Sequence, residues 1–297
     1  MGVTAKARER TAQRLLASSA RQSFDPLTEI DWDAQLAEDM FFMPQRRVSL
    51  YGTPLWDRMS RGQRIELSRH EAASVASVGI WFELILMQML ARYLYDRDPT
   101  SRHVQYGLTE IADECRHSVM FGRMIEKLNC PAYRVRRQTH HTARLMKALS
   151  TAPHSLAAIL IAEEILDAMQ REAMTDDSVQ PLVRQVCRIH VIEEARHVRY
   201  AQEELARIWP RLSAARRAQV RLNVAWAAVL IGRELLQPQC YAAVGLPVRE
   251  AYAAARANRQ RHETLTWAAT KVVSFFEELH LIDAVTRPMW RRAHLIA

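Results

Sequence analysis

Two five-residue segments, DECRH at residues 113–117 and EEARH at residues 193–197, decide the fold. Each begins with an acid and then reads Glu, any residue, Arg, His, and Glu194 follows Glu114 by 80 residues. A glutamate and a histidine three residues apart on a helix lie about 60° apart around the axis and one turn along it. Both side chains of each Glu-x-x-His pair therefore face one side of a helix, where they can bind the same metal ion.

The same offset of 80 residues relates two glutamates upstream. Glu83 lies in the apolar run GIWFELILM, and Glu163 lies in the apolar run LAAILIAEEIL. Burying an unpaired carboxylate is costly, so each needs a cation, a partner or a proton. One glutamate followed by Glu-x-x-His, present twice in register, is the symmetry of four-helix bundles that bind two metal ions. The structural alternative is a salt-bridge network with Arg116 and Arg196.

Two of these positions have rivals nearby. Glu164 is adjacent to Glu163, and because both flanks are apolar, periodicity does not choose between them. The 80-residue register favours Glu163. Glu71 is a weaker rival to Glu83, since it lies in the polar stretch ELSRHEAA.

His190 extends the second repeat to His-x-x-x-Glu-x-x-His. Relative to His190, Glu194 lies about 40° and His197 about −20° around the helix, so one helix presents three ligands on one face. The residue 80 positions earlier is Glu110, which makes the two halves unequal at this position. The alternative role for His190 is that of a core histidine beside the site.

Three further acids are expected beside the metal ligands rather than among them. Asp113 and Glu193 directly precede Glu114 and Glu194 and are placed to accept the outer N–H of a ligand histidine, which would fix its tautomer. Their alternative is a solvated charge. Glu110 shares the ligand face one turn before Glu114, and we expect it to be buried near the site.

Helical periodicity dominates the chain from residue 61 onward. Only 8 glycines and 11 prolines interrupt 297 residues, which favours long helices over strands. Residues 1–23 are predicted to be a flexible lead-in, and residues 24–297 a single domain whose first part, 24–60, wraps around it with short helices. Helices are predicted at about 62–95, 100–128, 153–174, 181–208, 213–236 and 248–282, with another within 129–150.

Composition excludes several classes of function. The formal net charge is +8, but the arginines are scattered without a basic stripe, so no nucleic-acid partner is expected. The N-terminus lacks the apolar core of a signal peptide, and the apolar runs are interrupted or too short to span a bilayer. The four cysteines lack C-x-x-C spacing, and Cys115 and Cys187 are expected to be buried thiols. A cytoplasmic protein without membrane association is expected.

The sequence resembles the AurF-type p-aminobenzoate N-oxygenase family over most of its length. The resemblance is carried by FDPLTEIDW, LYGTPLWDRMS, WFELIL, AEEIL and the two histidine motifs. It implies an all-α, ferritin-like helical bundle with additional C-terminal helices, a homodimer, and a di-iron site whose distinguishing mark is an extra histidine at the position of His190. The implied ligands are Glu83, Glu114, His117, Glu163, His190, Glu194 and His197.

The resemblance also implies a reaction. Two iron ions would activate O2, which would oxidise an amine, in this family an arylamine, towards hydroxylamine, nitroso or nitro products. An external reductase or small reductant would supply electrons. The ligand set suits manganese as well as iron. The alternatives are a di-iron C–H hydroxylase or desaturase of another metabolite, and a metal-binding bundle without enzymatic activity.

Overall fold

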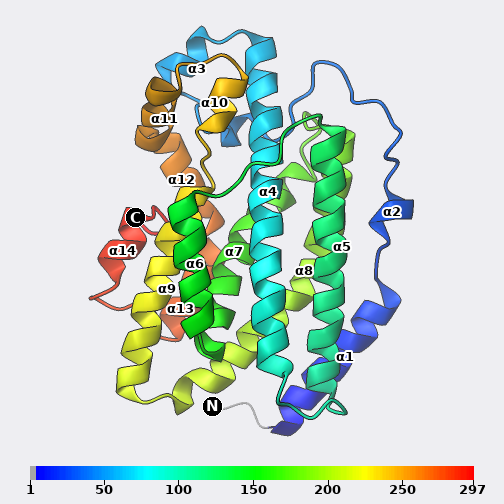
Figure 1. Ribbon diagram of the computed structural model, residues 1–297, viewed down its shortest axis with the longest axis vertical. Coiled ribbons are helices and arrows are strands. Elements are labelled where there is room, and N and C mark those ends of the chain that lie inside the picture. The colour runs from blue at the N-terminus through cyan, green and yellow to red at the C-terminus, as the bar shows by residue number, and fades with distance from the viewer. Residues whose placement is uncertain (1–4) are drawn as a thin grey trace.

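The computed structural model describes residues 5–297 and shows an all-α fold, which confirms the predicted fold class. Within these residues the only β pairing is an isolated bridge between Phe41 and Val179. The pairs α4–α5 and α7–α8 pack most closely, α4 also contacts α7, and α5 contacts α8. Figure 1 shows α4 and α5 side by side along the long axis. The four long helices of this bundle are α4 (Arg61–Leu94), α5 (Arg102–Lys127), α7 (Ala152–Ala173) and α8 (Pro181–Ile208).

Local sequence signals set the ends of these helices. Ser60 accepts a hydrogen bond from the backbone N–H of Gln63, whose side chain bonds back to Ser60 in a capping box. Ser101 caps α5 in the same position. Proline occupies the first turn of α7 and of α8, where its missing N–H has no cost. The observed ends agree with the predicted ranges to within two residues.

A second layer of helices covers the outer side of α7. Its contacts with α7 come from α9 (Ala214–Glu234), α12 (Arg259–Ala268) and α13 (Thr270–Glu278), while α14 (Arg287–Arg292) packs on α9. Leu160 and Ile161 of α7 share one hydrophobic core with Phe276 and Trp290, and none of the four side chains is exposed. The additional C-terminal helices predicted from the sequence are therefore packed onto the bundle.

The prediction of one helix over 248–282 is wrong. Three helices occupy this range: α11 (Val248–Ala257), α12 and α13. Asn258 adopts an extended conformation between the first two, and its side chain accepts a hydrogen bond from the backbone N–H of Gln260. An asparagine that caps the following helix competes with continuation of the preceding one, which explains the break.

The predicted flexible lead-in at residues 1–23 is also wrong over most of its length. Residues 5–21 form helix α1 (Ala5–Arg21), which packs against α5 and α8, and residues 1–4 lie outside the described part of the chain. Ala12 is buried, and Leu15 and Leu16 pack against the same core cluster. These apolar side chains recur at helical spacing in an otherwise polar segment, and the bundle supplies the surface that they cover.

Short helices connect the remaining parts of the fold. Residues 24–60 wrap the bundle as predicted and contain α2 (Pro26–Glu29), η1 (Gln45–Arg47) and α3 (Pro54–Arg58). The basic segment after α5 holds α6 (Arg137–Leu149), whose Thr139 donates a hydrogen bond to Glu234 at the end of α9. The connection after α8 begins with η2 (Trp209–Arg211), and α10 (Gln239–Ala243) follows α9.

Of the two cysteines predicted to be buried, only one is. All four cysteines are free, and Cys187 is buried, but Cys115 is exposed because it lies on the solvent side of α5, contrary to the prediction.

By length and composition α4 could cross a membrane, yet 56% of its most apolar window is buried inside the protein. Such burial is typical of the core helix of a soluble protein.

Replacing Trp290 with Ala tests whether the C-terminal helices belong to the same domain as the bundle. Trp290 of α14 is fully buried in the core that it shares with α7, α9 and α13, so we expect a loss of about 3–5 kcal/mol in the free energy of unfolding, in one cooperative transition. Trp226→Ala, which removes a 52% exposed tryptophan from α9, should cost less than about 1 kcal/mol. Two separate denaturant transitions would show that the layer folds independently.

Candidate metal centre

The four helices of the bundle bring the seven predicted ligand residues together at its centre. In each of three groups of side chains, every residue offers one potential ligand atom, and these atoms all lie within 4.8 Å of one another. His117 belongs to two of these groups, and so does His190. The groups are Glu114, His117, Glu194 and His197; Glu83, His117 and His190; and Glu163, His190 and Glu194.

These seven side chains are isolated from solvent. None is more than 2% exposed, although four are carboxylates and three are imidazoles. The rival residues lie elsewhere: Glu164 accepts a hydrogen bond from Gln202 at 2.8 Å, and Glu71 accepts one from the backbone of Ser49 at 2.9 Å. Neither belongs to a group of potential metal ligands among residues 5–297. The structure therefore gathers the residues that share the 80-residue register.

Each histidine of the repeated segments turns one ring nitrogen towards the carboxylates. His117 Nδ1 lies 3.3 Å from Glu114 Oε2, and His197 Nδ1 lies 2.9 Å from Glu194 Oε2. His197 Nδ1 is also 2.9 Å from Glu114 Oε1, so the two Glu-x-x-His pairs meet across the bundle. The Nδ1 atoms thus point to the centre of the cluster.

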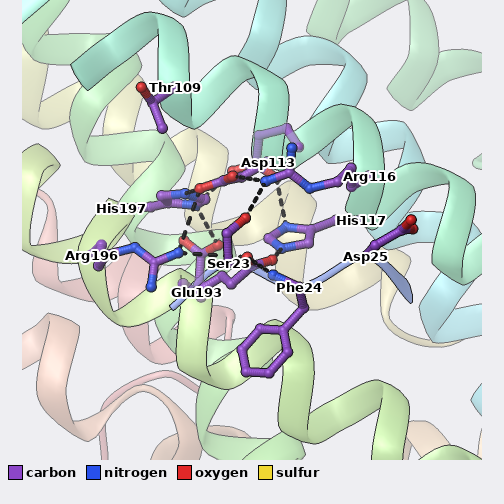
Figure 2. A network of polar contacts seen from close by, with 12 residues as sticks. Ser23, Phe24, Asp25, Thr109, Asp113, Arg116, His117, Glu193, Arg196 and His197 are labelled. Atoms are coloured by element: carbon purple, nitrogen blue, oxygen red, sulfur yellow. Dashed lines mark hydrogen bonds and ion pairs between the residues drawn. The ribbon is translucent and has the colours of Figure 1, made fainter. Parts of the chain in front are cut away.

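The outer nitrogens of the same histidines are held by the acids that precede the paired glutamates. His117 Nε2 lies 2.9 Å from Glu193 Oε2, and His197 Nε2 lies 3.1 Å from Asp113 Oδ2 (Figure 2). The pairing is crossed, because each acid holds the histidine of the other segment. An Nε2–H that donates to a carboxylate leaves Nδ1 as the free lone pair, which is the arrangement that a metal requires.

Two arginines and the wrapping segment surround this pair of acids. Arg116 donates to Asp113 and, at 3.1 Å, to Ser23 Oγ, while Arg196 Nη2 lies 3.6 Å from both Asp113 and Glu193. Figure 2 shows Ser23 and Phe24 beside this network. The salt-bridge network considered from the sequence therefore exists, but it engages the outer acids and leaves the central carboxylates to other partners.

Residues 23–24 and Ser118 contribute contacts that sequence reasoning missed. The backbone N–H of Phe24 donates to Glu193 Oε1 at 3.1 Å, and Ser118 donates to Glu83 Oε2 at 2.6 Å. A backbone donor 169 residues away carries no signal in the side-chain pattern. Ser118 directly follows a histidine motif, but a serine in a helix has many other roles.

Protein groups alone leave several atoms of the cluster unsatisfied. Glu194 Oε1 and His190 Nδ1 are buried without a hydrogen-bond partner, and so is Oε2 of Glu110, which is 2% exposed. Burial, reinforced by the charges of Glu194 and Glu114, raises the pKa of Glu163 well above its usual value. Buried atoms of this kind are costly unless a ligand satisfies them. The donor set of four carboxylates and three imidazoles therefore fits divalent cations.

His117 and His197 carry compensating charge when protons alone occupy the cluster. Burial lowers the pKa of His117, but its hydrogen bonds to Glu114 and Glu193 outweigh this effect and raise the pKa to about 10. The pKa of His197 is raised well above its usual value, since Glu194 and Glu114 outweigh the effect of burial. Because metal ligands must be deprotonated, cation binding here would release protons.

Comparisons with known proteins agree with this geometry. The family model of p-aminobenzoate N-oxygenase AurF matches residues 5–280, which include the whole cluster. Uncharacterized proteins of Mycobacterium bovis and of two Mycobacterium tuberculosis strains are 31% identical over 216 residues, covering 70% of this chain. The chain matches 63% of the length of these relatives. The chain belongs to the p-aminobenzoate N-oxygenase AurF family.

Proposed function

We propose that the protein is a di-iron, O2-dependent N-oxygenase that oxidises an arylamine towards hydroxylamine, nitroso or nitro products. Family membership supports an oxygenase, and the buried cluster supports a metal-dependent one. The observation that carries the proposal is the position of His190. It lies within 4.8 Å of ligand atoms in two of the three groups, one containing Glu83 and one containing Glu163. A third histidine at the centre is what the sequence pattern of this family implies.

In this proposal seven side chains hold the two ions: Glu83, Glu114, His117, Glu163, His190, Glu194 and His197. When bound, iron supplies the activation of O2 and the transfer of electrons, which protein side chains do not perform. The four carboxylates would offset the positive charge of two divalent ions in a site that is shielded from bulk solvent. The same residue types suit manganese, so iron is part of the proposal.

The residues around the ligands fix their protonation and orientation. Asp113 and Glu193 each accept the Nε2–H of one histidine, and this holds both rings with Nδ1 towards the centre. Arg116 and Arg196 in turn pair with these acids, and the backbone N–H of Phe24 binds Glu193. Glu110 is placed close enough to Glu114 and Glu194 for their charges to raise its pKa further beyond the effect of burial. We assign these residues to positioning, not to metal binding.

His190 makes the two halves of the site unequal. The corresponding position of the first repeat is Glu110, which belongs to no group of potential ligands within residues 5–297. His190 Nε2 lies 3.8 Å from Glu83 Oε1, and its ring packs 4.6 Å from that of His117 and 5.0 Å from that of Phe121. Its orientation is thus fixed by aromatic packing, and one ion would have one more nitrogen ligand than the other.

The electron donor, the cellular compartment and the oligomeric state are also part of the proposal. We propose an external reductase or small reductant as electron donor, a cytoplasmic protein and a homodimer. The relatives matched here carry no assigned activity, and part of their length lies outside the match. Substrate and partners are therefore argued from the chemistry of this chain.

The direct test of the proposed function is product analysis. Iron-loaded, chemically reduced protein is mixed with O2 and a panel of aromatic amines, and products are identified by mass spectrometry with 18O2. We expect the label in a hydroxylamine, nitroso or nitro product. Label found only at carbon would favour the C–H oxidation alternative, and the absence of any product with a fully loaded site would contradict an oxygenase of amines.

Replacing His190 with Ala tests its role as a ligand. The remaining six residues still provide both Glu-x-x-His pairs, so we expect the fold and an iron content near two per protomer to persist. Loss of one nitrogen ligand should lower amine oxidation by about tenfold to a hundredfold and change the Mössbauer parameters of one iron only. His141→Ala, on the exposed surface of α6, is the control. Unchanged spectra and rates in His190→Ala would remove His190 from the ligand set.

A further inference from the structure

Buried polar residues continue beyond the candidate metal centre towards one end of the bundle. On α8, Tyr200 and Glu204 follow the proposed ligand His197 at intervals of three and four residues, so the three side chains share one face. On α5, His103 lies on the face that carries Glu114. None of these five side chains is more than 3% exposed. The polar stripe that holds the ligands therefore extends past them.

The opposite end of the bundle core is apolar. There the same two helix faces continue with Phe121 on α5 and with Val183 and Val186 on α8. Burying the carboxylate of Glu204 and the imidazole of His103 costs free energy that apolar side chains would not cost. Packing therefore does not require polar residues at the end where α4 finishes and α5 begins, which is the lower end in Figure 1.

Aromatic rings connect this end of the core with the surface. The ring centroids of Tyr106 and Tyr200 are 5.0 Å apart, and the ring of Tyr200 stacks on that of His103 at the same distance. Tyr93 of α4 follows, 5.8 Å from His103. The first three are buried, and Tyr93 is half-buried. These four residues are called the aromatic pathway below.

The inner end of the aromatic pathway lies beside the proposed ligands. Tyr200 follows His197 on α8 by one helical turn. Burial raises the pKa of the Tyr106 phenol, and the nearby charge of His197 opposes this effect. The hydroxyl of Tyr106 is buried without a hydrogen-bond partner. Two phenols are thus close to the ligand helix without being ligands themselves.

Two phenols of the pathway have a base within hydrogen-bond distance. Tyr93 donates to Glu204 Oε2 at 2.5 Å, and the hydroxyl of Tyr200 lies 3.2 Å from His103 Nε2. Burial raises the pKa of Glu204, but its hydrogen bonds from Arg207 outweigh this effect, so the pKa is lowered and the carboxylate is ionised. A phenol that loses an electron becomes strongly acidic, and an adjacent base makes its oxidation easier.

The outer end of the pathway is cationic. The guanidinium of Arg97 lies 4.0 Å from the ring centroid of Tyr93, and Arg207 pairs with Glu204. Positive charge attracts small anions from solution. An anionic reductant such as ascorbate is therefore favoured at this end.

Resting on the proposed function, we propose that the aromatic pathway carries oxidising equivalents from the metal centre to the surface when no amine consumes them. One electron leaves Tyr93 and reduces the oxidised metal centre by way of the other three residues. The O–H bond of Tyr93 breaks, its proton passes to Glu204, and a neutral tyrosyl radical remains. Ascorbate then returns one electron, Glu204 returns the proton, and the phenol is restored.

Freeze-quench EPR of iron(II)-loaded protein mixed with O2 without amine tests the proposal. We expect the signal of a neutral tyrosyl radical, whose hyperfine splitting changes when tyrosine carries ring deuterium. Tyr93→Phe should lose this signal, and so should Tyr200→Phe, which interrupts the pathway, and Glu204→Gln, which removes the base. Tyr95→Phe, at an 86% exposed position two residues from Tyr93, is the control and should keep the signal.

Mössbauer spectra, iron content and circular dichroism of the same samples show whether each protein is folded, loaded and oxidised. Oxidised iron without a tyrosyl radical in the unmodified protein would overturn the proposal. A signal that tyrosine deuteration does not change, or an unchanged signal in Tyr93→Phe, would also overturn it. A role in packing alone predicts these contrary results, because phenylalanine preserves the contacts of the ring.

Oxidative damage measures whether the pathway protects the protein. After repeated exposure of reduced protein to O2 without amine, peptide mass spectrometry should find more oxidised side chains near the metal centre in Tyr93→Phe than in the unmodified protein. With saturating amine both proteins should give the same product yield. Equal damage in both would overturn the protective role.

The outcomes also separate this proposal from the proposed function. N-oxygenation of amines without a tyrosyl radical would leave the proposed function in place and overturn the pathway. A tyrosyl radical that depends on Tyr93, without N-oxygenation of any amine, would support the pathway and contradict the proposed function.

Discussion

The structure depends on the presence of four carboxylates in the solvent-shielded centre of a helical bundle. Glu83, Glu114, Glu163 and Glu194 are at most 2% exposed, and a carboxylate there is stable only with a cation or a proton nearby. His117 and His197 partly meet this requirement, since the neighbouring glutamates raise their pKa values and so favour the protonated, charged rings. Metal ions would meet it more fully, because they also satisfy the lone pairs that hydrogen bonds leave free.

This requirement explains why two distant segments share one arrangement of residues. In each five-residue segment the second and fifth residues, a glutamate and a histidine, face the centre. The first residue, Asp113 or Glu193, accepts a hydrogen bond from the histidine of the other segment. The arginines pair with these acids, and residues 23–24 bind the network from the wrapping segment. Each segment therefore orients the other, so the two halves form a single site. Helix α1 precedes the wrapping segment and packs on α5 and α8, which helps to hold the wrapping segment in place.

The sequence predicted the parts of this arrangement that depend on local periodicity. Serine caps and prolines predicted the ends of the helices. The 80-residue register favoured Glu163 over Glu164, although both flanks are equally apolar, and Glu163 lies in the cluster. What it did not predict depends on long-range contacts. The order of α1 comes from the surface that the bundle provides. At the break between α11 and α12, the Asn258 side chain donates hydrogen bonds to the backbone oxygens of Ser49 and Tyr51, 209 and 207 residues away in the sequence. The hydrogen bond from the Phe24 N–H and the aromatic pathway arise from packing between elements far apart in the chain.

The central claim is that two metal ions occupy the bundle, and anomalous X-ray scattering from crystals of the iron-loaded protein tests it most directly. Data collected on both sides of the iron absorption edge separate iron from other elements. The account predicts two iron peaks per protomer between α4, α5, α7 and α8, about 3.5–4 Å apart, the separation typical of two-metal sites. A single peak, or no peak while the carboxylates stay paired with protonated histidines, would contradict it.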